Sequence, residues 1–568
     1  MSRTQSLASC PWSRIAVIAL FALGNAACSD SEPAPSRAPE VDQSEALYAP
    51  DRLVEIAIEM DEAEWDALRD EGHSLLEFQQ GTPVGFDYTY FSASVKVDDK
   101  PLERVAIRKK GALGSLSRFR PSLILDIDRN VEDQKVYGVN RLTLNNDRSD
   151  SAHARTCMAY ELFTKAGLPA SRCNLAHVTV NGHDLGTYSN VEPIRKPMLA
   201  RHFADNDGNL YEGQEDADFT QEAYQRFQVK TNEDKNDKSD LARVAQAMEA
   251  DDAHLVTELS KVIDLDHFRR FWAMETLSGN WDSYSGNTNN FFTYHDPTTD
   301  KFYFMPWGPD ASFTGASIID SYNKTLTVYA TGAISNRLYN IPSERKKFRD
   351  LLADLNDGVW DTPALLSRLY ELQDISTDAW PGAVENLREY ISTYSDRLRA
   401  ELAEPAPEWK LGGIDLRDEC AGQLGEASAS FQFPFTSGEL SPDPSVGAVQ
   451  ATLKIGDKSI EAFWFGGVGR NPEGSDRQVG MQLFGAMPDG RIAILALSMP
   501  PQGFAPGTQP FYNFETVGYV VIGQGEEFKF AGLVTEGSIE FDEASMEAGA
   551  DVAGSFHGLV YQTGCVDL

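Results

Sequence analysis

The spacing of apolar residues changes twice along this chain of 568 residues, and those changes limit the fold more strongly than any single motif. Before about residue 200, apolar and polar residues alternate in short runs, which is typical of half-buried strands. Over residues 240–280 the apolar residues recur at helical spacing, and a second helical region covers residues 343–402. This order predicts an α+β, two-lobed domain over residues 49–403.

A separate all-β domain is predicted after this part. Residues 404–409 read Glu-Pro-Ala-Pro-Glu-Trp and mark a boundary. Beyond it, short apolar runs alternate with turns rich in Gly and Pro, at the spacing of a β-sandwich. We therefore predict a β-sandwich accessory domain over residues 410–568. A chain of this length also exceeds what one domain usually holds.

Tight turns divide the strand-rich part. Asn181-Gly182 separates two alternating runs, and this dipeptide is among the strongest short-range signals for a hairpin. Asp98, Asp99 and Lys100 separate another two runs. The runs on either side of each turn are therefore expected to pair as antiparallel strands.

The formal net charge is −36 at pH 7, so the surface is strongly acidic. Binding to nucleic acid without sequence preference requires Lys and Arg against phosphates, and attachment to anionic lipid requires the same cations. The charge therefore argues against both. No partner of either kind is expected.

Residues 1–28 read as an export signal of the lipoprotein type. Arg3 and Arg14 supply positive charge before an apolar run over residues 15–23, which is too short to span a bilayer. Small residues precede Cys28, which would be lipidated and become the first mature residue. Asn25 stands where Leu is usual, so ordinary cleavage after Ala27 is the alternative. A Ser- and Pro-rich linker over residues 29–48 follows.

The expected location is the cell envelope. No other stretch of the sequence approaches 18 apolar residues, so a membrane contact is expected only through a lipid at Cys28.

Four cysteines lie outside the signal, and an even number in an exported chain suggests two disulfides. Three connectivities are open. Proximity in the sequence favours Cys157 with Cys173 and Cys420 with Cys565. The cysteines and histidines lack zinc spacing, so a zinc site is not expected.

A cationic turn follows the strand-like run that begins at residue 105. Backbone N–H groups of a Gly- and Ser-rich turn, together with Lys and Arg, hold phosphate in many proteins. The residues concerned are Arg108, Lys109, Lys110, Gly111, Ser115, Arg118 and Arg120. The alternative is a hairpin with a solvated basic face, because the sequence lacks the GK[ST] of a Walker A loop.

Two carboxylates flank an Asn-rich loop over residues 279–310. Asp282 follows a helix end, and Asp310 follows an aromatic strand. Carboxylate and carboxamide oxygens suit Mg²⁺, and Asn287 and Asn290 supply the carboxamides. Turn formation is the alternative for each of these residues taken alone.

Two further polar positions follow strands. Glu192 comes at the end of the Asn-Gly hairpin, where it pairs either a phosphate-binding Lys or a surface cation. Asn145 and Asn146 precede a helix, and capping of that helix is the simpler explanation for them. The sequence has no GxSxG motif of a serine hydrolase.

Several motifs in order resemble the CotH (spore coat protein H) kinase family of secreted or surface proteins, which have an atypical protein-kinase-like fold. The matching segments are IRKKGALGSLSRFRPSL, YGVNRLTLNND, YELFTKAGLPASRCNLAHVTVNGHDLGTYSNVE, GNLYEG and GNWDSYSGNTNNFFTYHDPTTDKFYFMPWGPD. They cover roughly residues 52–402, and the sequence after residue 409 lies outside the resemblance.

The resemblance implies catalytic and metal-binding roles. Asp282 matches the catalytic-loop Asp, and Asp310 matches the metal-binding Asp of the family's Pro-Trp-x-x-Asp motif. Asn290 resembles the metal-binding Asn. Asn287 competes for that role because it keeps the kinase spacing of five residues from Asp282.

The resemblance also implies a nucleotide-binding set. Lys110 and Gly111 resemble the Lys-Gly of the phosphate-facing turn, in which Ser115 also lies, and Glu192 resembles the Glu after the hairpin. The family often has a basic residue where this chain has Ile124. The cation that contacts phosphate would then be Lys110, Arg108 or Arg120.

The activity implied is ATP- and Mg²⁺- or Mn²⁺-dependent phosphoryl transfer to Ser or Thr of a protein substrate. One departure weakens this reading, because Gly308 stands where the family often has an Asp. The alternative is a catalytically weak or inactive kinase-like protein that serves in surface binding, adhesion or envelope structure. A third reading is transfer of another group from a nucleotide.

Overall fold

The structure is a computed structural model. It describes residues 43–72, 87–214, 217–314, 325–409, 422–435, 447–455, 458–470, 478–512, 515–524 and 527–562. The predicted export signal, its cleavage site and most of the predicted linker lie outside these residues.

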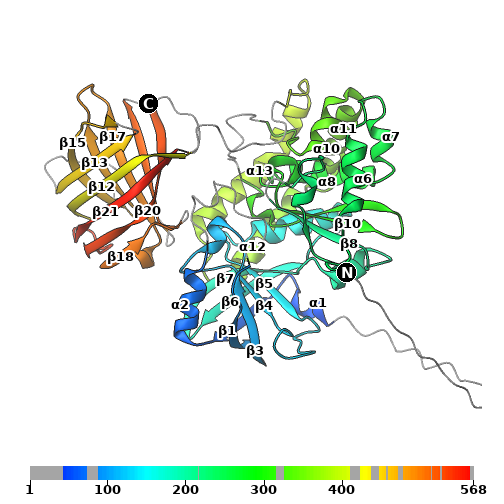
Figure 1. The fold of residues 1–568 in the computed structure, drawn as a ribbon, viewed down its shortest axis with the longest axis horizontal. Coiled ribbons are helices and arrows are strands. Elements are labelled where there is room, and N and C mark those ends of the chain that lie inside the picture. Colours follow the sequence, from blue (N-terminus) through cyan, green and yellow to red (C-terminus); the bar gives the residue numbers. More distant parts are fainter. Residues whose placement is uncertain are drawn as a thin grey trace, which may run out of the picture. The chain divides into compact units, whose positions relative to one another are not determined.

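The first part of the chain forms a closed barrel, drawn in blue to cyan in Figure 1. Around the barrel the strand order is β1-β2-β3-β4-β5-β7-β6, and β1 and β6 close it as a parallel pair. Its strands are β1 (Leu53–Glu59), β2 (Phe91–Val97), β3 (Lys100–Lys109), β4 (Leu123–Asp126), β5 (Arg141–Asn145), β6 (Cys173–Val180) and β7 (His183–Val191). Alternate side chains such as Ile56, Ile107 and Leu125 fill its interior, as the alternating sequence predicts.

The hairpin predicted at Asn181-Gly182 is confirmed. It joins β6 to β7, and both turn residues adopt positive φ, 50° for Asn181 and 76° for Gly182. Positive φ at both central positions is the requirement of the turn that matches strand twist, and Asn and Gly meet it at low cost. Asp98 likewise has φ of 54° between β2 and β3.

The second part combines helices with a small antiparallel sheet of order β11-β10-β8-β9. The sheet strands are β8 (Asn209–Gly213), β9 (Gln228–Val229), β10 (Phe291–Asp296) and β11 (Lys301–Pro306). The α-helices described before residue 410 are α1 (Ser44–Leu47), α2 (Glu62–Asp70), α4 (Arg155–Lys165), α5 (Lys196–His202), α6 (Ser239–Met248), α7 (Leu255–Leu259), α8 (Leu265–Leu277), α9 (Tyr284–Asn287), α10 (Ala333–Asn340), α11 (Pro342–Gly358), α12 (Thr362–Ile375) and α13 (Pro381–Leu402). The α+β prediction for this domain is confirmed.

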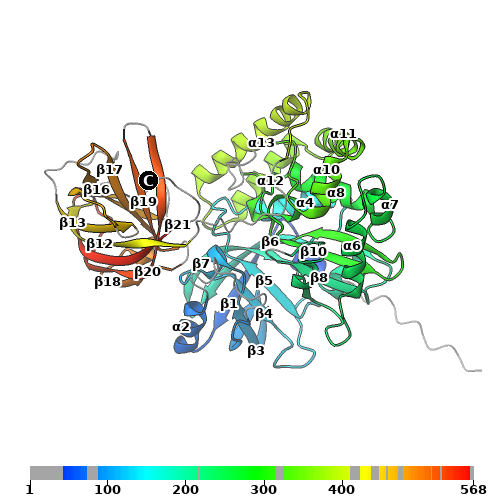
Figure 2. The same ribbon diagram turned by 45° about the horizontal axis from the view of Figure 1, so that its top comes forward.

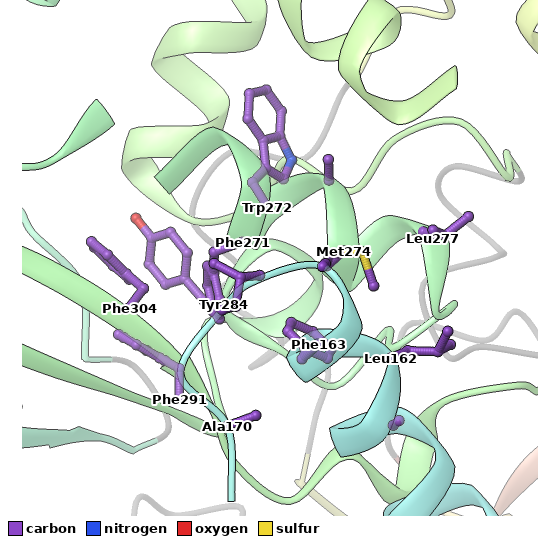
Figure 3. Close-up of a cluster of buried hydrophobic side chains, with 14 of the residues drawn as sticks. Leu162, Phe163, Ala170, Phe271, Trp272, Met274, Leu277, Tyr284, Phe291 and Phe304 are labelled. Atoms are coloured by element: carbon purple, nitrogen blue, oxygen red, sulfur yellow. The ribbon is translucent and has the colours of Figure 1, made fainter. Parts of the chain in front are cut away.

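Helix α8 packs against β11 of the small sheet, and both can be located in the ribbon views of Figures 1 and 2. Aromatic side chains make this contact, since the rings of Phe268 and Phe271 lie beside Phe304. Figure 3 shows Phe271 of α8 beside Tyr284, Phe291 and Phe304, whereas Trp272 points away from them and stacks on Phe348 of α11. All of these side chains are buried, and the rings of Tyr284 and Phe291 lie 4.8 Å apart between centroids. This packing fixes the end of α8 relative to the start of β10 and the end of β11.

The region after residue 421 is all-β, as predicted. Its strands form one hydrogen-bonded sheet of order β14-β13-β12-β21-β20-β19-β17-β16-β15, with β18 added to β20. The sheet folds back on itself, since β15 at one end contacts β12 and β13 near the other end. The strands are β12 (Gly422–Pro434), β13 (Ala448–Ile455), β14 (Lys458–Ser459), β15 (Phe463–Arg470), β16 (Val479–Ala486), β17 (Ile492–Met499), β18 (Gly507–Pro510), β19 (Val517–Gln524), β20 (Glu527–Glu543) and β21 (Asp551–Gln562).

Long strands make the hydrogen bonding of this sheet continuous. β20 has 17 residues and pairs with β18, β19 and β21, so hydrogen bonding continues without a break. One apolar core, which includes Phe431, Leu495 and Val520, packs against the sheet.

A disulfide joins Cys157 of α4 to Cys173 of β6, which confirms the first predicted pair. Cys420 and Cys565 lie outside the described residues. In the part of the chain that the structure covers, none of the helices combines the length and apolar character needed to cross a membrane.

The disulfide closes a loop of 16 residues, so its reduction should lower the free energy of unfolding by about 3 kcal/mol, mainly by relaxing the unfolded chain. Urea unfolding of the wild type with and without reductant measures this change. The Cys157→Ala, Cys173→Ala double variant is the control, because reductant then acts only on the other cysteines. Equal effects of reductant on the two proteins would contradict the prediction.

Candidate active site

Asp282 lies between α8 and α9 and accepts hydrogen bonds from a cluster of carboxamides. Asn287 Nδ2 donates to Asp282 Oδ1 at 2.7 Å, and Asn290 Nδ2 donates to Asp282 Oδ2 at 2.8 Å. Asn289 Nδ2 adds a longer contact of 3.3 Å to Oδ1. The Asn-rich loop therefore holds both oxygens of one carboxylate in place, and the carboxamide oxygens remain for other partners.

The loop reaches this geometry through a tight backbone turn. Thr288 and Asn290 have φ of 49° and 50°, in the left-handed region that Asn tolerates better than most residues. The turn folds Asn290 back so that its Nδ2 also donates to the backbone oxygen of Asp282 at 3.0 Å.

Burial raises the pKa of Asp282 to about 6, and the nearby charge of Asp310 adds to the rise. Burial also raises the pKa of Asp310 above its ordinary value. A pKa near neutrality suits a group that must accept a proton, and two such carboxylates in one place are typical of functional sites.

Asp310 lies just beyond β11, in the short 3-10 helix Pro309–Ala311. Ser149 Oγ donates to Asp310 Oδ2 at 2.7 Å. The N–H of Gly308 donates to Tyr160 Oη at 3.2 Å, which ties this turn to α4.

Lys110 at the end of β3 belongs to the same site. Its Nζ donates to Asn145 Oδ1 and lies 5.6 Å from the ring centroid of Trp307. Burial lowers the pKa of Lys110 to about 8, and the charges of Asp310 and Glu212 oppose the change. A bound anion would favour the charged ammonium, so this lysine is suited to a phosphate.

Gly111 is required by the turn that follows. Its φ is +84°, and a Cβ there would lie 2.6 Å from the Cβ of Ser115. Any side chain at residue 111 would therefore open the turn that carries Lys110 and Ser115.

The other predicted phosphate-binding cations have protein partners. Arg108 donates from Nη1 to the Lys109 oxygen at 2.9 Å and lies over the ring of Tyr90. Arg120 donates from Nη1 to Asp378 Oδ2 at 2.8 Å and from Nη2 to the Thr187 oxygen. Lys110 is the candidate whose ammonium is influenced by the charge of Asp310.

The expectation that Asn145 and Asn146 cap α4 is wrong. Asp150 performs that role, since its Oδ2 accepts from Ala154 N at 2.8 Å and from Arg155 N at 2.7 Å. Asn145 instead faces Lys110. The sequence signal for this was a run of polar residues directly after an apolar strand.

Glu192 also has partners other than a phosphate-binding lysine. Its carboxylate accepts from Arg172 Nη2 at 2.8 Å and pairs with Arg201. The strand register is the reason, because Cys173 pairs with Val191 and Arg172 therefore lies opposite Glu192. The Glu192 N–H donates to the Arg172 oxygen at 2.9 Å.

Glu275 is a site residue that sequence reasoning missed, because it lies on an otherwise apolar face of α8. It is buried and accepts from Tyr284 N at 3.2 Å and from Ser285 N at 3.0 Å. Tyr284 Oη in turn donates to Asp218 at 3.0 Å. These bonds hold the segment that directly follows Asp282.

The residues present fit a divalent cation. Asn287 Oδ1 is buried without a hydrogen-bond partner among the residues described, and a Cβ at Gly308 would lie 3.1 Å from Asn290 Oδ1. Oxygen donors of this kind are those that Mg²⁺ prefers. The described residues hold no group of three or more His, Cys, Asp or Glu arranged for a metal, so a ligand's phosphates would complete the set.

A buried lysine at the start of a Gly- and Ser-containing turn lies beside two carboxylates and a carboxamide loop. Together with the α+β fold, this arrangement is kinase-like. Residues 107–376 match the family described as CotH kinase protein. This part of the chain is therefore similar to the CotH family.

Named relatives share this part of the chain. Invasin CotH2 of Rhizopus delemar is 22% identical over 262 residues, which are 41% of this chain and 44% of that protein. Inner spore coat protein H of Bacillus subtilis is 22% identical over 275 residues, which are 45% of this chain and 74% of that protein. The chain thus spans less than half the length of the invasin. The Helicobacter pylori proinflammatory kinase CtkA aligns at a TM-score of 0.30 and 11% identity, over 53% of this chain and 95% of CtkA.

Glu275 predicts a pH dependence of stability. Burial raises its pKa to about 8, so the folded chain keeps a proton that the unfolded chain releases above about pH 4.5. Its contribution to stability is therefore lost as pH rises toward 8. Urea unfolding of the wild type and Glu275→Gln at about pH 7 and about pH 8.5 should show a smaller loss in the variant. Parallel losses would contradict the assignment.

Proposed function

We propose that this chain is an exported atypical protein kinase that transfers the γ-phosphoryl group of ATP to Ser or Thr of a protein, with Mg²⁺ or Mn²⁺. The observation that carries the proposal is the environment of Asp282. Three carboxamides orient this carboxylate, burial brings its pKa near neutrality, and Asp310 adds its charge. An acceptor hydroxyl needs such a group in its vicinity.

The roles of the chain's own residues follow from this geometry. Lys110 supplies a cation at the start of the Gly-containing turn, and Gly111 lets the turn close on Ser115. Asp310 and the oxygens of Asn287 or Asn290 would hold the divalent ion, which when bound neutralises phosphate charge. Asp282 orients the acceptor hydroxyl and takes its proton. The site acts by positioning and by charge stabilisation.

The proposed location is the cell envelope or surface. Relatives carry the names of an inner spore coat protein and of invasins, and the sequence before residue 29 has the features of a lipoprotein signal. The proposed acceptor is therefore a protein outside the cytoplasm. Attachment would be through a lipid at Cys28.

A kinase-like binding protein is the second candidate. Gly308 favours it, because the family often has a carboxylate at this position, which lies beside the Asn290 oxygen. The name invasin on relatives also favours it. The two candidates differ in whether the Asp282 carboxylate is needed for phosphoryl transfer.

Asp282→Asn should reduce phosphoryl transfer by at least about 10²-fold, because the carboxamide cannot accept the hydroxyl proton. The measurement is transfer of γ-labelled phosphate to the chain itself and to dephosphorylated casein, with Mg²⁺ or Mn²⁺. Asp99→Asn is the matched control, since that side chain is 89% exposed in the β2–β3 turn. Undiminished labelling by a folded Asp282→Asn protein would refute the assignment, and no labelling by the wild type would favour the binding protein.

A further inference from the structure

His153 is buried between two carboxylates. It lies just before α4, and its side chain has no exposed area. Nδ1 lies 3.0 Å from Asp147 Oδ2, and Nε2 lies 3.1 Å from Asp378 Oδ1. Carboxylate oxygens only accept, so the imidazole donates to both only when both nitrogens carry protons. The geometry therefore calls for an imidazolium.

The first carboxylate belongs to residues 145–150, the segment that reaches the candidate active site. Asp147 also accepts from Ser189 Oγ at 3.0 Å, which fixes it against β7. Two residues before it, Asn145 contacts Lys110, and two residues after it, Ser149 contacts Asp310. A displacement of Asp147 would therefore move two contacts of the site at once.

The second carboxylate, Asp378, is hydrogen-bonded to the turn over residues 110–122. Asp378 lies between α12 and α13 and accepts from Thr187 N at 3.0 Å. Its other oxygen accepts from Arg120 Nη1, and the Arg120 N–H donates to Ser117 Oγ at 2.9 Å. Gly186 permits the approach, since a Cβ there would lie 2.4 Å from Asp378 Oδ2.

The turn and the 145–150 segment also bond to each other directly. Asn146 N donates to Ser122 Oγ at 3.0 Å, and Asn146 Nδ2 donates to the Arg120 oxygen at 2.7 Å. His153 thus joins two series of hydrogen bonds that support the site, one through Asp147 and one through Asp378.

Charge balance in this cluster depends on the imidazolium. The groups that face it are Asp147 and Asp150 from the 145–150 segment, Arg120 from the turn, Asp378 from before α13 and Tyr188 of β7. Burial alone would lower the pKa of His153, but its bonds to the two carboxylates leave that pKa raised. His153 and Arg120 together hold the pKa of Asp378 far below its ordinary value.

We propose that His153 is a positioning residue of this site, in which its imidazolium joins Asp147 and Asp378 and so fixes residues 145–149 and the turn over residues 110–122. The inference deepens the proposed function, on which its nucleotide readout rests. The fixing of the turn is a property of the chain without nucleotide and is measured separately.

The first measurement is amide hydrogen exchange of the full chain without nucleotide. His153→Gln keeps a polar side chain but removes the charge, and Asp378→Asn keeps the shape of its side chain and removes the charge at the other end. Both should raise exchange about tenfold within residues 110–122 and 145–149, since a hydrogen bond to a charged group is lost. Unchanged exchange in these two segments in either folded variant would overturn the proposal.

His177→Gln is the matched control. His177 also lies between two carboxylates, with Glu55 Oε2 and Asp184 Oδ1 each at 2.9 Å, but it is partly exposed on β6. Among the described contacts it has none with the turn or with residues 145–150. Its replacement should leave exchange in both segments unchanged, and an equal rise there would overturn a specific role for His153.

The second measurement is Mg-ATP affinity of the same variants across pH. In the wild type the affinity should fall as pH rises through the raised pKa of His153, because the neutral imidazole donates only one hydrogen bond. His153→Gln should bind about tenfold more weakly below that pKa and lose this pH dependence. The double variant His153→Gln, Asp378→Asn restores charge balance and should recover part of the affinity.

The two measurements distinguish failure of the proposed function from failure of the proposed role of His153. A wild type that does not bind Mg-ATP contradicts the proposed function, while the exchange result still decides the role of His153. A wild type that binds Mg-ATP with the same affinity and pH profile as a folded His153→Gln protein overturns the role of His153 alone.

Discussion

The aromatic contacts of α8 and α9 with the β10–β11 hairpin are the interaction on which the site depends. Tyr284 and Phe291 pack with their ring centroids 4.8 Å apart, and Phe304 of β11 lies 5.6 Å from Phe271 of α8. Asp282 follows α8, Asn290 precedes β10 and Asp310 follows β11. One buried aromatic cluster therefore sets the relative positions of the three chain segments that carry Asp282, Asn290 and Asp310 of the candidate site.

The ionisable groups of the site form a second constraint, because burial shifts the pKa of each in the direction that disfavours its charged form. Burial raises the pKa of Asp282 and Asp310 and lowers that of Lys110. A divalent ion beside the carboxylates and a phosphate beside the lysine would each relieve this condition. The proposed site thus combines carboxylates that suit a cation with a lysine that suits an anion, and residues farther away, such as Glu275 and His153, hold the segments in place.

The sequence was a good guide wherever a local pattern dictated the structure. Asn181-Gly182 forms its hairpin because both residues accept positive φ, and the Asp282–Asn290 loop folds on itself for a similar reason. The Cys157–Cys173 pair formed between neighbours in the sequence. Features that arise from nearby residue types and short spacing were predictable.

Features set by tertiary register were not predictable. Glu192 pairs with Arg172 because strand pairing places them opposite each other, and no spacing along the chain reveals that register. Asn145 faces Lys110 across β3, β4 and β5, so capping of the next helix was the simpler local explanation. His153 gave no local signal, since both of its partners are defined by packing.

The most direct test of the account is the thermal stability of the full chain with ATP and Mg²⁺ or Mn²⁺, measured beside Asp310→Ala and the exposed control Asp99→Ala. A ligand at 100 times its dissociation constant adds about 2.7 kcal/mol to stability, which a melting curve resolves. The account predicts a metal-dependent rise in Tm for the wild type and Asp99→Ala and none for Asp310→Ala. A well-folded wild type without a shift at millimolar ATP, or an equal shift in Asp310→Ala, would contradict it.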